Sequence, residues 1–468
     1  MISSDPPFST AGDETEPYPN ATTNACKLCT PLGACLAFRG IEGAVPFLHG
    51  SQGCATYIRR YLISHFREPM DIAASNFSES SAVFGGGANL KTGLANVLRQ
   101  YQPKLIGLAT TCLSETIGED VPGHLNDFAG SPEGAQNETP IVPVSTASFR
   151  GTHVDGFHDA VKALVQSLAK GTPESFPGHA PIAVLPGMVS AADLREIKRI
   201  AREFGVPLTL LPDYSETLDG PSWADYEKLP TGGTPVAAIR ALPRSRAMIE
   251  CGRTLAYRGS TAATVAKDKH GVEIHRIGLP IGLRETDALI RLLSSLSGRP
   301  VPHSLKLERG RLLDSWVDGH KYVFEKRAIV YGEEDLVVGL ASLLAEIGII
   351  PILCASGGKS GRLGDAILSA APSLKGRCEI RSGVDFAEIS SRGAELRPDF
   401  LIGSSKGYSL ARKLGIPLIR CGFPIHDRIG GQRVLHVGYA GAQQLFDSIT
   451  NALLERKQAD SAIGYSYL

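Results

Sequence analysis

Residues 327–353 read RAIVYGEEDLVVGLASLLAEIGIIPIL, and they give the clearest indication of the fold class. Two short apolar runs, at 327–331 and 349–353, enclose a segment at 336–347 whose apolar residues follow helical spacing. A strand, a helix and a second strand in this order form a βαβ unit, which places two parallel strands in one sheet beneath a covering helix. The stretch therefore predicts an α/β fold with parallel sheets.

The same alternation continues along the chain. Further apolar runs lie at residues 105–109, 141–144, 182–185, 208–211, 400–403 and 416–419, and helical patterns lie at 192–204 and 439–455. Several of the runs end in glycine or a small polar residue, where open α/β sheets bind their ligands. We predict a polar N-terminal arm at 1–24 and three α/β domains at 25–170, 171–322 and 323–468, without a sequence repeat of fixed period.

Composition narrows the class of function. The chain has 468 residues, of which 43% are hydrophobic and 21% charged, and its 48 basic residues balance 48 acidic ones. A neutral chain without a basic run has no field that attracts nucleic acid or an anionic membrane surface, so we expect neither as a partner. No apolar stretch reaches the ~18 residues of a membrane span. There is no signal-peptide pattern either, so we expect a cytoplasmic protein.

Cysteine is the residue type that indicates chemistry. Five of the nine cysteines lie before residue 113, which is not the distribution of a disulfide framework. Cys29, Cys54 and Cys112 each lie in a turn-rich stretch or directly after a short apolar run, in the sequences CTPLG, HGSQGC and ATTC. Iron–sulfur ligands need such backbone settings, whereas small buried thiols, the alternative interpretation, do not.

Glycines accompany these cysteines. Gly33 follows Cys29, while Gly50 and Gly53 precede Cys54. We expect the three glycines to let the main chain approach a bulky inorganic core and to leave N–H groups free to point at sulfide.

The remaining cysteines are weaker candidates. Cys26 forms a CxxC pair with Cys29, and Cys35 adds a thiol nearby. A single CxxC is a weak zinc signal without a second pair or histidines at matching spacing. Cys26 is either an additional cluster ligand or a buried thiol without a ligand role, and we favour the second. Cys354 and Cys421 follow apolar runs and are expected to be structural thiols.

Several motifs, taken in chain order, resemble the β-type subunits of nitrogenase component 1. They are HGSQGC at 49–54, HFREP at 65–69, AVFGG at 82–86, TTCLSETIGED at 110–120, GLPIG at 278–282 and IRCGFPIHDR at 419–428. The resemblance covers the chain apart from its N-terminal arm. It implies three Rossmann-like domains, an α-type partner in an α2β2 heterotetramer, and a homodimeric ATP-dependent iron protein as electron donor.

The resemblance also implies roles for single residues. Cys29, Cys54 and Cys112 match the β-type ligands of an [8Fe-7S] P-cluster shared with the α-type subunit. Ser148 matches a serine that ligates iron when the cluster is oxidised; a serine that caps a local turn is the alternative. Phe84 matches the aromatic residue on which the iron protein docks; an ordinary exposed aromatic is the alternative. The substrate cofactor is bound by the α-type chain, so we expect no catalytic residue in this one.

Two functions remain open. In the first, the chain belongs to a nitrogenase-like reductase and relays electrons to a metallocofactor in the α-type partner, for reduction of N2 or of C–S bonds in methylthio-alkanes. In the second, it is the β-type half of the scaffold that matures the nitrogenase cofactor and shares a [4Fe-4S] cluster. Well-known scaffold β chains lose two of the three cysteines. This chain has all three together with Ser148, which favours the reductase.

Three other motifs are expected to have no chemical role. Residues 85–87 are glycines, but they lack the lysine and hydroxyl that follow in a phosphate-binding loop, so we expect no nucleotide there. His49 and His65 are expected to be hydrogen-bonded histidines rather than metal ligands. Residues 308–311 (ERGR), with Asp314, are expected to form the salt-bridged start of a helix.

Overall fold

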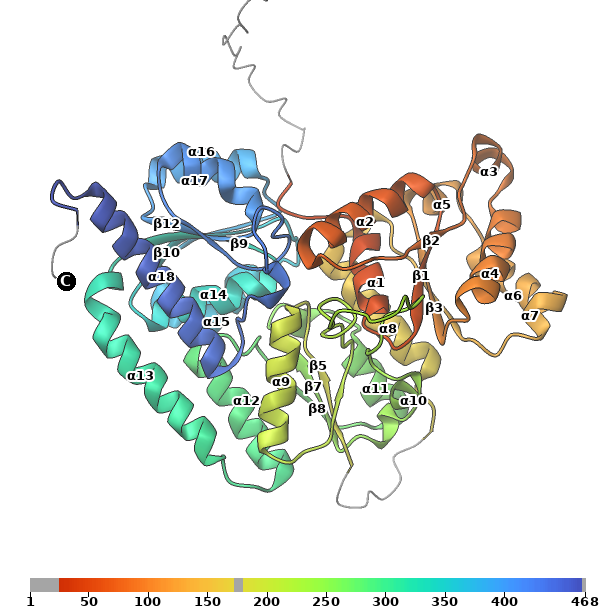
Figure 1. The fold of residues 1–468 in the computed structure, drawn as a ribbon, viewed down its shortest axis with the longest axis horizontal. Helices are drawn as coiled ribbons and strands as arrows, with labels where there is room; N and C mark the ends of the chain where they lie inside the picture. Colours follow the sequence, from red (N-terminus) through yellow and green to blue (C-terminus); the bar gives the residue numbers. More distant parts are fainter. Residues whose placement is uncertain (1–24, 172–179, 465–468) are drawn as a thin grey trace, which may run out of the picture.

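The computed structural model describes residues 25–171 and 180–464. The predicted N-terminal arm at 1–24 lies outside these ranges. So do residues 172–179, next to the boundary predicted between residues 170 and 171. The described chain forms three parallel sheets flanked by helices, as the sequence predicted. Figure 1 shows the sheets in three separate parts of the molecule.

The first sheet has the strand order β2-β1-β3-β4, and all of its strands are parallel. Its strands are β1 (Ala44–His49), β2 (Ala73–Ala74), β3 (Leu105–Thr110) and β4 (Ile141–Val144). The helices of this part are α1 (Thr30–Arg39), α2 (Gln52–Phe66), α3 (Glu79–Phe84), α4 (Gly87–Tyr101), α5 (Cys112–Ile117), α6 (Val121–Ala129), α7 (Pro132–Ala135) and α8 (His153–Leu168), with a 3₁₀ turn at Ser148–Arg150. β1 and β3 are buried along their whole length because helices cover both faces of the sheet.

The second sheet has the strand order β6-β5-β7-β8. Its strands are β5 (Ile182–Leu185), β6 (Leu208–Leu210), β7 (Ala247–Cys251) and β8 (Ile274–Ile277). The helices are α9 (Ala191–Glu203), α10 (Val236–Arg240), α11 (Ala262–His270), α12 (Gly282–Ser297) and α13 (His303–Val323). α9 begins at a capping box, in which Ser190 Oγ accepts the Asp193 N–H at 3.0 Å and the Asp193 carboxylate accepts the Ser190 N–H at 2.9 Å.

The third sheet has the strand order β11-β10-β9-β12-β13. Its strands are β9 (Arg327–Gly332), β10 (Ile350–Ser356), β11 (Glu379–Ser382), β12 (Phe400–Gly403) and β13 (Leu418–Arg420). The helices are α14 (Glu334–Glu346), α15 (Leu363–Ala370), α16 (Phe386–Leu396), α17 (Tyr408–Leu414) and α18 (Gly438–Asp460). β9, α14 and β10 are the βαβ unit predicted from residues 327–353. The last helix, α18, returns to lie along α13 and α12 (Figure 1).

The strands fall inside the three predicted domain ranges, at 44–144, 182–277 and 327–420. The exact domain boundaries stay a prediction. Within the described ranges, no helix is both long enough and apolar enough to cross a lipid bilayer.

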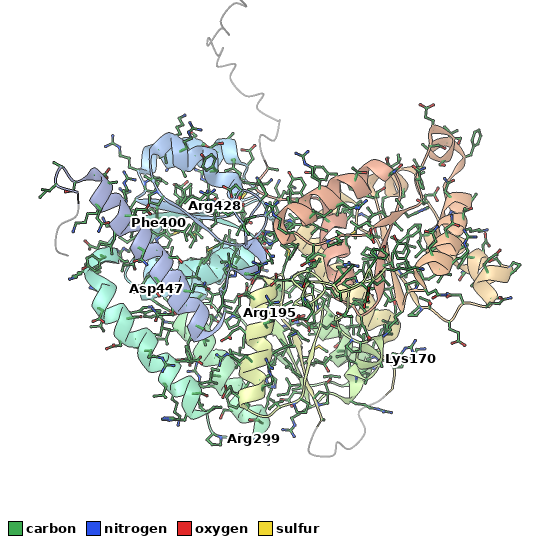
Figure 2. The ribbon with its side chains drawn as sticks, in the orientation of Figure 1. Lys170, Arg195, Arg299, Phe400, Arg428 and Asp447 are labelled. Atoms are coloured by element: carbon green, nitrogen blue, oxygen red, sulfur yellow. The ribbon has the colours of Figure 1, made fainter. Side chains whose placement is uncertain are left out.

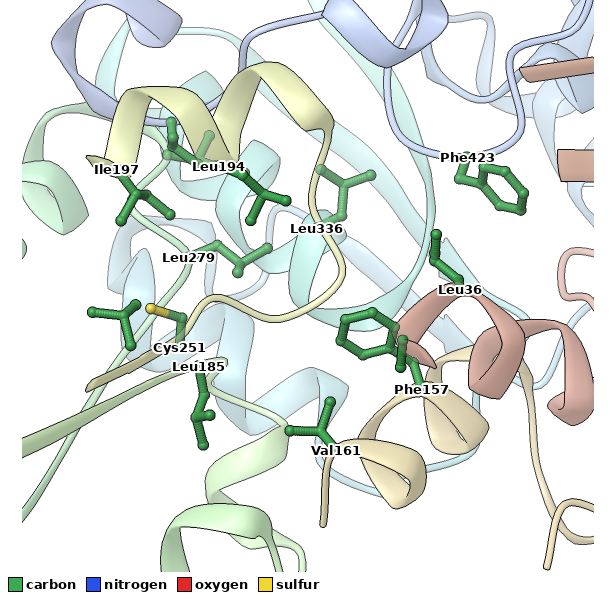
Figure 3. Packing of buried hydrophobic residues seen from close by; sticks show 14 of the residues in the cluster. Leu36, Phe157, Val161, Leu185, Leu194, Ile197, Cys251, Leu279, Leu336 and Phe423 are labelled. Atoms are coloured by element: carbon green, nitrogen blue, oxygen red, sulfur yellow. The ribbon is translucent and has the colours of Figure 1, made fainter. Parts of the chain in front are cut away.

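One apolar cluster joins all three parts of the molecule. Figure 3 shows Leu36 of α1, Phe157 of α8, Leu336 of α14 and Phe423 within this cluster, and all four side chains are buried. Removing apolar surface from water at this junction stabilises the three parts against one another. The elements that carry the cysteines are therefore supported from the second and third sheets.

A polar link crosses the same junction. Arg195 of α9, labelled in Figure 2, pairs with the carboxylate of Asp219, whose side chain is only 6% exposed. Asp219 also accepts hydrogen bonds from Gln432 Nε2 at 3.1 Å and from Arg433 Nε at 3.0 Å. A buried carboxylate needs such partners, and here they come from both the second and the third part.

The predicted helix start at residues 308–311 is wrong. α13 begins at His303, so this motif lies inside the helix. Glu308 pairs with Arg199 of α9 at 2.8 Å, and Arg309 pairs with Asp287 of α12 at 3.0 Å. The charges therefore bridge neighbouring helices instead of stabilising a helix start.

Candidate functional site

The three predicted cysteine ligands occupy the same kind of position, at the start of a helix. Cys29 is the N-cap of α1, Cys54 is the third residue of α2, and Cys112 is the first residue of α5. α2 follows β1 and α5 follows β3, so Cys54 and Cys112 lie at the carboxyl edge of the first sheet. Unpaired N–H groups at helix starts favour a negatively charged group such as a thiolate.

Ser148 links two of these positions. Its N–H donates to Cys112 Sγ at 3.2 Å, and its Oγ accepts the Thr30 N–H at 3.3 Å. Thr30 directly follows Cys29, so the serine hydroxyl satisfies an amide at the start of α1. The side chain therefore caps a helix that is distant in sequence, and its predicted role as an iron ligand stays a prediction.

His153, which was not among the predicted site residues, fixes the main chain directly before Cys29. The ring Nδ1 of His153 accepts the Leu28 N–H at 3.2 Å, and the main-chain N–H of His153 donates to the Leu28 carbonyl oxygen at 3.0 Å. Its Nε2 lies 3.1 Å from Oε1 of Glu333, the N-cap of α14. These partners are 125 and 180 residues away in sequence, so no local motif could have identified this histidine.

Gly33 serves helix packing, and the prediction that it faces an inorganic core is wrong. The residue is buried, and a Cβ added to it would lie 1.6 Å from the carbonyl oxygen of His153. On the facing helix, a Cβ on Gly156 would lie 2.0 Å from the carbonyl oxygen of Thr30. The main chains of α1 and α8 therefore touch at both points, and only glycine leaves room for this contact.

The two glycines before Cys54 have different roles. Gly50 has φ +154°, and a Cβ on it would lie 1.9 Å from Oγ1 of Thr111, so the turn before Cys54 packs on the residue before Cys112. Gly50 therefore faces protein, contrary to our expectation. Gly53 is exposed, and its Cβ would meet only Ser51 Oγ at 3.6 Å. Of the three glycines, Gly53 has open space beside it.

The three thiols affect one another's ionisation. Burial raises the pKa of the Cys29 thiol to about 11, the Leu32 N–H offsets part of this rise, and the neighbouring Cys54 and Cys112 add to it. Burial also raises the pKa of Cys54, and Cys112 contributes to the same direction. Thiolates at all three positions would repel one another, so ionising them together requires a compensating positive charge such as that of metal ions.

Cys26 lies in a different environment from the three cysteines. Its side chain packs on the apolar cluster of the third sheet, and burial raises its pKa to about 12. The main chain around it is fixed by Lys406, whose Nζ donates to the carbonyl oxygens of Ala25 and Lys27. Cys26 is half-buried, as the three cysteines are, but it packs against the third sheet, which favours a thiol without a ligand role.

Other residues predicted to be structural are buried or hydrogen-bonded inside the fold. Cys354 and Cys421 are fully buried. His49 Nδ1 lies 3.1 Å from a serine hydroxyl and its Nε2 lies 3.0 Å from a glutamate, while His65 Nδ1 accepts the Ile425 N–H at 2.9 Å. Both histidines are thus hydrogen-bonded inside the fold.

Phe84 is the most exposed of the candidate residues. Its side chain is 88% exposed, and the neighbouring Val83 is 74% exposed, so the end of α3 presents two apolar side chains to solvent. Exposed apolar residues on a polar protein surface are candidates for contact with another protein. Tyr57 lies in α2, three residues after Cys54. Its side chain is 45% exposed, and its ring lies against the ring of Tyr61.

The donor set fits an iron–sulfur cluster better than a site for one ion. Within residues 25–171 and 180–464, no three His, Cys, Asp or Glu side chains form a group that could hold a single metal ion. An iron–sulfur cluster spreads its cysteine ligands over several irons, so its ligands need not converge on one point. Three half-buried thiols at helix starts, one of them already accepting a main-chain N–H, have the chemistry that such a cluster requires.

Comparisons with known proteins agree with this assignment of the fold. The family model described as "Nitrogenase component 1 type Oxidoreductase" matches residues 29–454. The chain is 36% identical over 439 residues to the nitrogenase molybdenum-iron protein beta chain of Clostridium pasteurianum, with 92% of this chain and 93% of that one covered. It is 35% identical over 452 residues to the beta chain of the same name from Azotobacter vinelandii, covering 93% and 84%. A solved structure described as "Nitrogenase Cp1 at pH 6.5" superposes with a TM-score of 0.92 at 33% identity, covering 97% of this chain and 98% of the other.

The chain therefore belongs to the nitrogenase component 1 family. Within this family it is a β-type subunit, and hence one chain of a nitrogenase-like oxidoreductase complex.

Proposed function

We propose that this chain holds half of an [8Fe-7S] P-cluster at its interface with an α-type subunit, in an α2β2 heterotetramer of the cytoplasm. Cys29, Cys54 and Cys112 are the three cluster ligands that this chain supplies. Electrons arrive from a homodimeric ATP-dependent iron protein and leave toward a metallocofactor in the α-type partner, where N2 or the C–S bond of a methylthio-alkane is reduced. The cluster would supply the capacity to accept and release electrons.

The observation that carries this proposal is the set of contacts that connects all three cysteines. Ser148 contacts Cys112 Sγ through its N–H and the amide after Cys29 through its hydroxyl. Gly50 brings the turn before Cys54 against Thr111. Three thiols from three separate helices are thus kept at one edge of the sheet, whereas isolated structural thiols need no such connections.

The residues around the thiols have distinct tasks in this proposal. The Ser148 N–H donates to Cys112 Sγ, which stabilises negative charge on that sulfur. His153 and Glu333 fix the main chain before Cys29 from the buried side. The open face beside Gly53 is available for the partner chain and its own ligands. Because each subunit supplies only half of the ligands, cluster binding and subunit assembly are linked.

We further propose that the iron protein docks on the exposed pair Val83 and Phe84. The support is the exposure of both side chains at the end of α3, in the motif AVFGG that resembles the family's docking loop. Burying two exposed apolar side chains at the centre of an interface supplies affinity that polar neighbours alone would not.

The first test is spectroscopic. The complex with its α-type partner is purified without oxygen, iron is counted per αβ pair, and EPR spectra are recorded in dithionite-reduced and in oxidised samples. A cluster that is silent when reduced and gains a signal on two-electron oxidation, with turnover in the presence of the iron protein, supports the proposal. A reduced S = 1/2 signal of a [4Fe-4S] cluster, together with a cofactor that transfers to an apo-enzyme, makes the chain a maturation scaffold instead.

A further inference from the structure

Glu119 is a buried carboxylate that contacts three separate segments of the first part of the molecule. Its side chain is 4% exposed, although it lies only two residues after the end of the short helix α5. Its Oε1 accepts the Gly86 N–H at 2.6 Å, while its Oε2 lies 3.0 Å from His49 Nε2 and 3.1 Å from His124 Nε2. The contacts with Gly86 and His49 each lead to a proposed functional element, whereas His124 belongs to α6.

The first contact holds the turn that follows the exposed pair Val83 and Phe84. In this turn Gly85 has φ +91°, a backbone conformation that favours glycine. A Cβ on Gly86 would lie 2.2 Å from the ring of Phe77, and a Cβ on Gly87 would lie 2.5 Å from the ring of His124. The turn is thus enclosed on both sides, and its central N–H has the Glu119 carboxylate as its acceptor.

The second contact reaches the strand end that leads to Cys54. His49 is the last residue of β1, and its Nδ1 lies 3.1 Å from Ser75 Oγ. Ser75 Oγ also accepts the Gly50 N–H at 2.9 Å. Burial lowers the pKa of His49, and the neighbouring Glu119 opposes this shift. The ring thus lies between the Glu119 carboxylate and the serine that holds the Gly50 N–H.

The third connection is through the chain itself. Glu119 comes two residues after α5, whose first residue is Cys112, and its N–H donates to the Ser114 carbonyl oxygen at 3.1 Å. α3, which carries the exposed pair, also packs on α5. The carboxylate therefore joins the exposed corner, the turn before Cys54 and the helix of Cys112.

We propose that Glu119 is a positioning residue that couples the Val83–Phe84 corner to the turns carrying Cys54 and Cys112. This inference rests on the proposed function in that the corner is taken as the docking site. A displacement of the corner by a docked protein moves the Gly86 N–H, and the carboxylate passes that displacement to both cysteine-bearing segments.

The test compares Glu119→Ala and Glu119→Gln with the unmodified complex. Glutamine keeps the shape and one acceptor oxygen, so it separates the charge from the hydrogen bond and preserves a folded variant if alanine fails. Asp127→Ala is the matched control, because it removes an exposed carboxylate of the same domain that pairs with Lys91 and contacts none of these segments.

Hydrogen exchange and iron-protein titration are measured on the same samples. In Glu119→Ala we expect exchange of the 85–87 amides to rise about tenfold, the factor expected for losing a hydrogen bond to a charged group. We expect unchanged iron content, a higher half-saturating concentration of iron protein, and more ATP hydrolysed per electron delivered. A purely structural role would lower activity without changing this ATP ratio. Asp127→Ala should match the unmodified complex in every measurement.

Two results would overturn the proposal. One is unchanged exchange together with unchanged half-saturation in Glu119→Ala. The other is loss of iron in both Glu119 variants while the 85–87 amides stay protected, because Glu119 would then act on Cys112 alone. If the unmodified complex accepts no electrons from the iron protein, the proposed function fails, and the exchange experiment still reports whether Glu119 couples the segments.

Discussion

Replacing Gly33 with alanine tests the close contact between α1 and α8, and through it the placement of Cys29. A Cβ at residue 33 would lie 1.6 Å from the His153 carbonyl oxygen and 2.8 Å from the Phe157 nitrogen. Both are main-chain atoms, which cannot rotate away, so the cost belongs at the upper end of overpacking, about 3 kcal/mol. Alanine recovers about 1 kcal/mol of helix propensity. We therefore expect a net destabilisation of about 2 kcal/mol, or a fall of about 4–8 °C in the unfolding midpoint.

Gly310→Ala is the matched control. Gly310 lies inside α13, and nothing comes within 4 Å of an added Cβ there, so alanine should stabilise by about 1 kcal/mol. Gly156→Ala should behave like Gly33→Ala, because its Cβ would lie 2.0 Å from the Thr30 carbonyl oxygen. Midpoints are compared by calorimetry of the purified complexes at one scan rate.

Iron content gives a second measure of the same change. If α1 shifts to relieve the clash, Cys29 at its start moves too, and Gly33→Ala should bind less iron than Gly310→Ala. A midpoint that rises equally in both variants would refute the close contact, and with it the reason that α1 is held in place.

Three further predictions concern the cluster, the docking corner and a buried ion pair. Cys54→Ala should lose more iron per αβ pair than Cys26→Ala, because only Cys54 lies among the connected thiols; equal losses would make Cys26 a ligand. Phe84→Ala should raise the half-saturating concentration of iron protein and leave iron content unchanged, and an unaltered titration would remove this side chain from the docking site. Burial alone would lower the pKa of His436, but the Asp193 carboxylate, 2.8 Å from its Nδ1, raises it to about 10. Because this lies above the unfolded value of about 6.5, the stabilisation from the charged histidine is complete below that pH and is lost as the pH rises toward 10. The difference in unfolding midpoint between the unmodified chain and His436→Gln should therefore narrow between pH ~6.5 and ~10, and a constant difference would contradict the charged state.

The fold was predictable where a buried strand is an uninterrupted run of apolar residues. β3, β9 and β12 are buried strands, and their apolar runs identified them to within a residue. β8 (IHRI) and β11 (EIRS) were not among the predicted runs, because each is an edge strand with polar, partly exposed side chains. Two buried strands were also missed, β1 (AVPFLH) and β7 (AMIEC), since a proline interrupts the first apolar run and a glutamate the second.

The site was predictable in its residue types but not in its arrangement. Local sequence marked Cys29, Cys54 and Cys112 as candidates, since turns and glycines lie around them. Which glycine faces open space was not readable, because the partner of Gly33 is His153 on a distant helix. The ion pairs of residues 308–311 were misassigned for the same reason: Glu308 and Arg199 are 109 residues apart.

The contacts of Lys406 with Ala25 and Lys27 also set an order of events during protein synthesis. Lys406 is 381 residues downstream of Ala25, yet it fixes the segment that leads into Cys29. At about 5–20 residues per second, the ribosome needs roughly 20–80 s to produce this lysine after Ala25. Glu333, whose carboxylate contacts the His153 ring that holds the Leu28 N–H, is also synthesised late. The main chain that leads into Cys29 therefore reaches its final position only when the last third of the chain has folded. We expect iron to be inserted into finished chains rather than nascent ones.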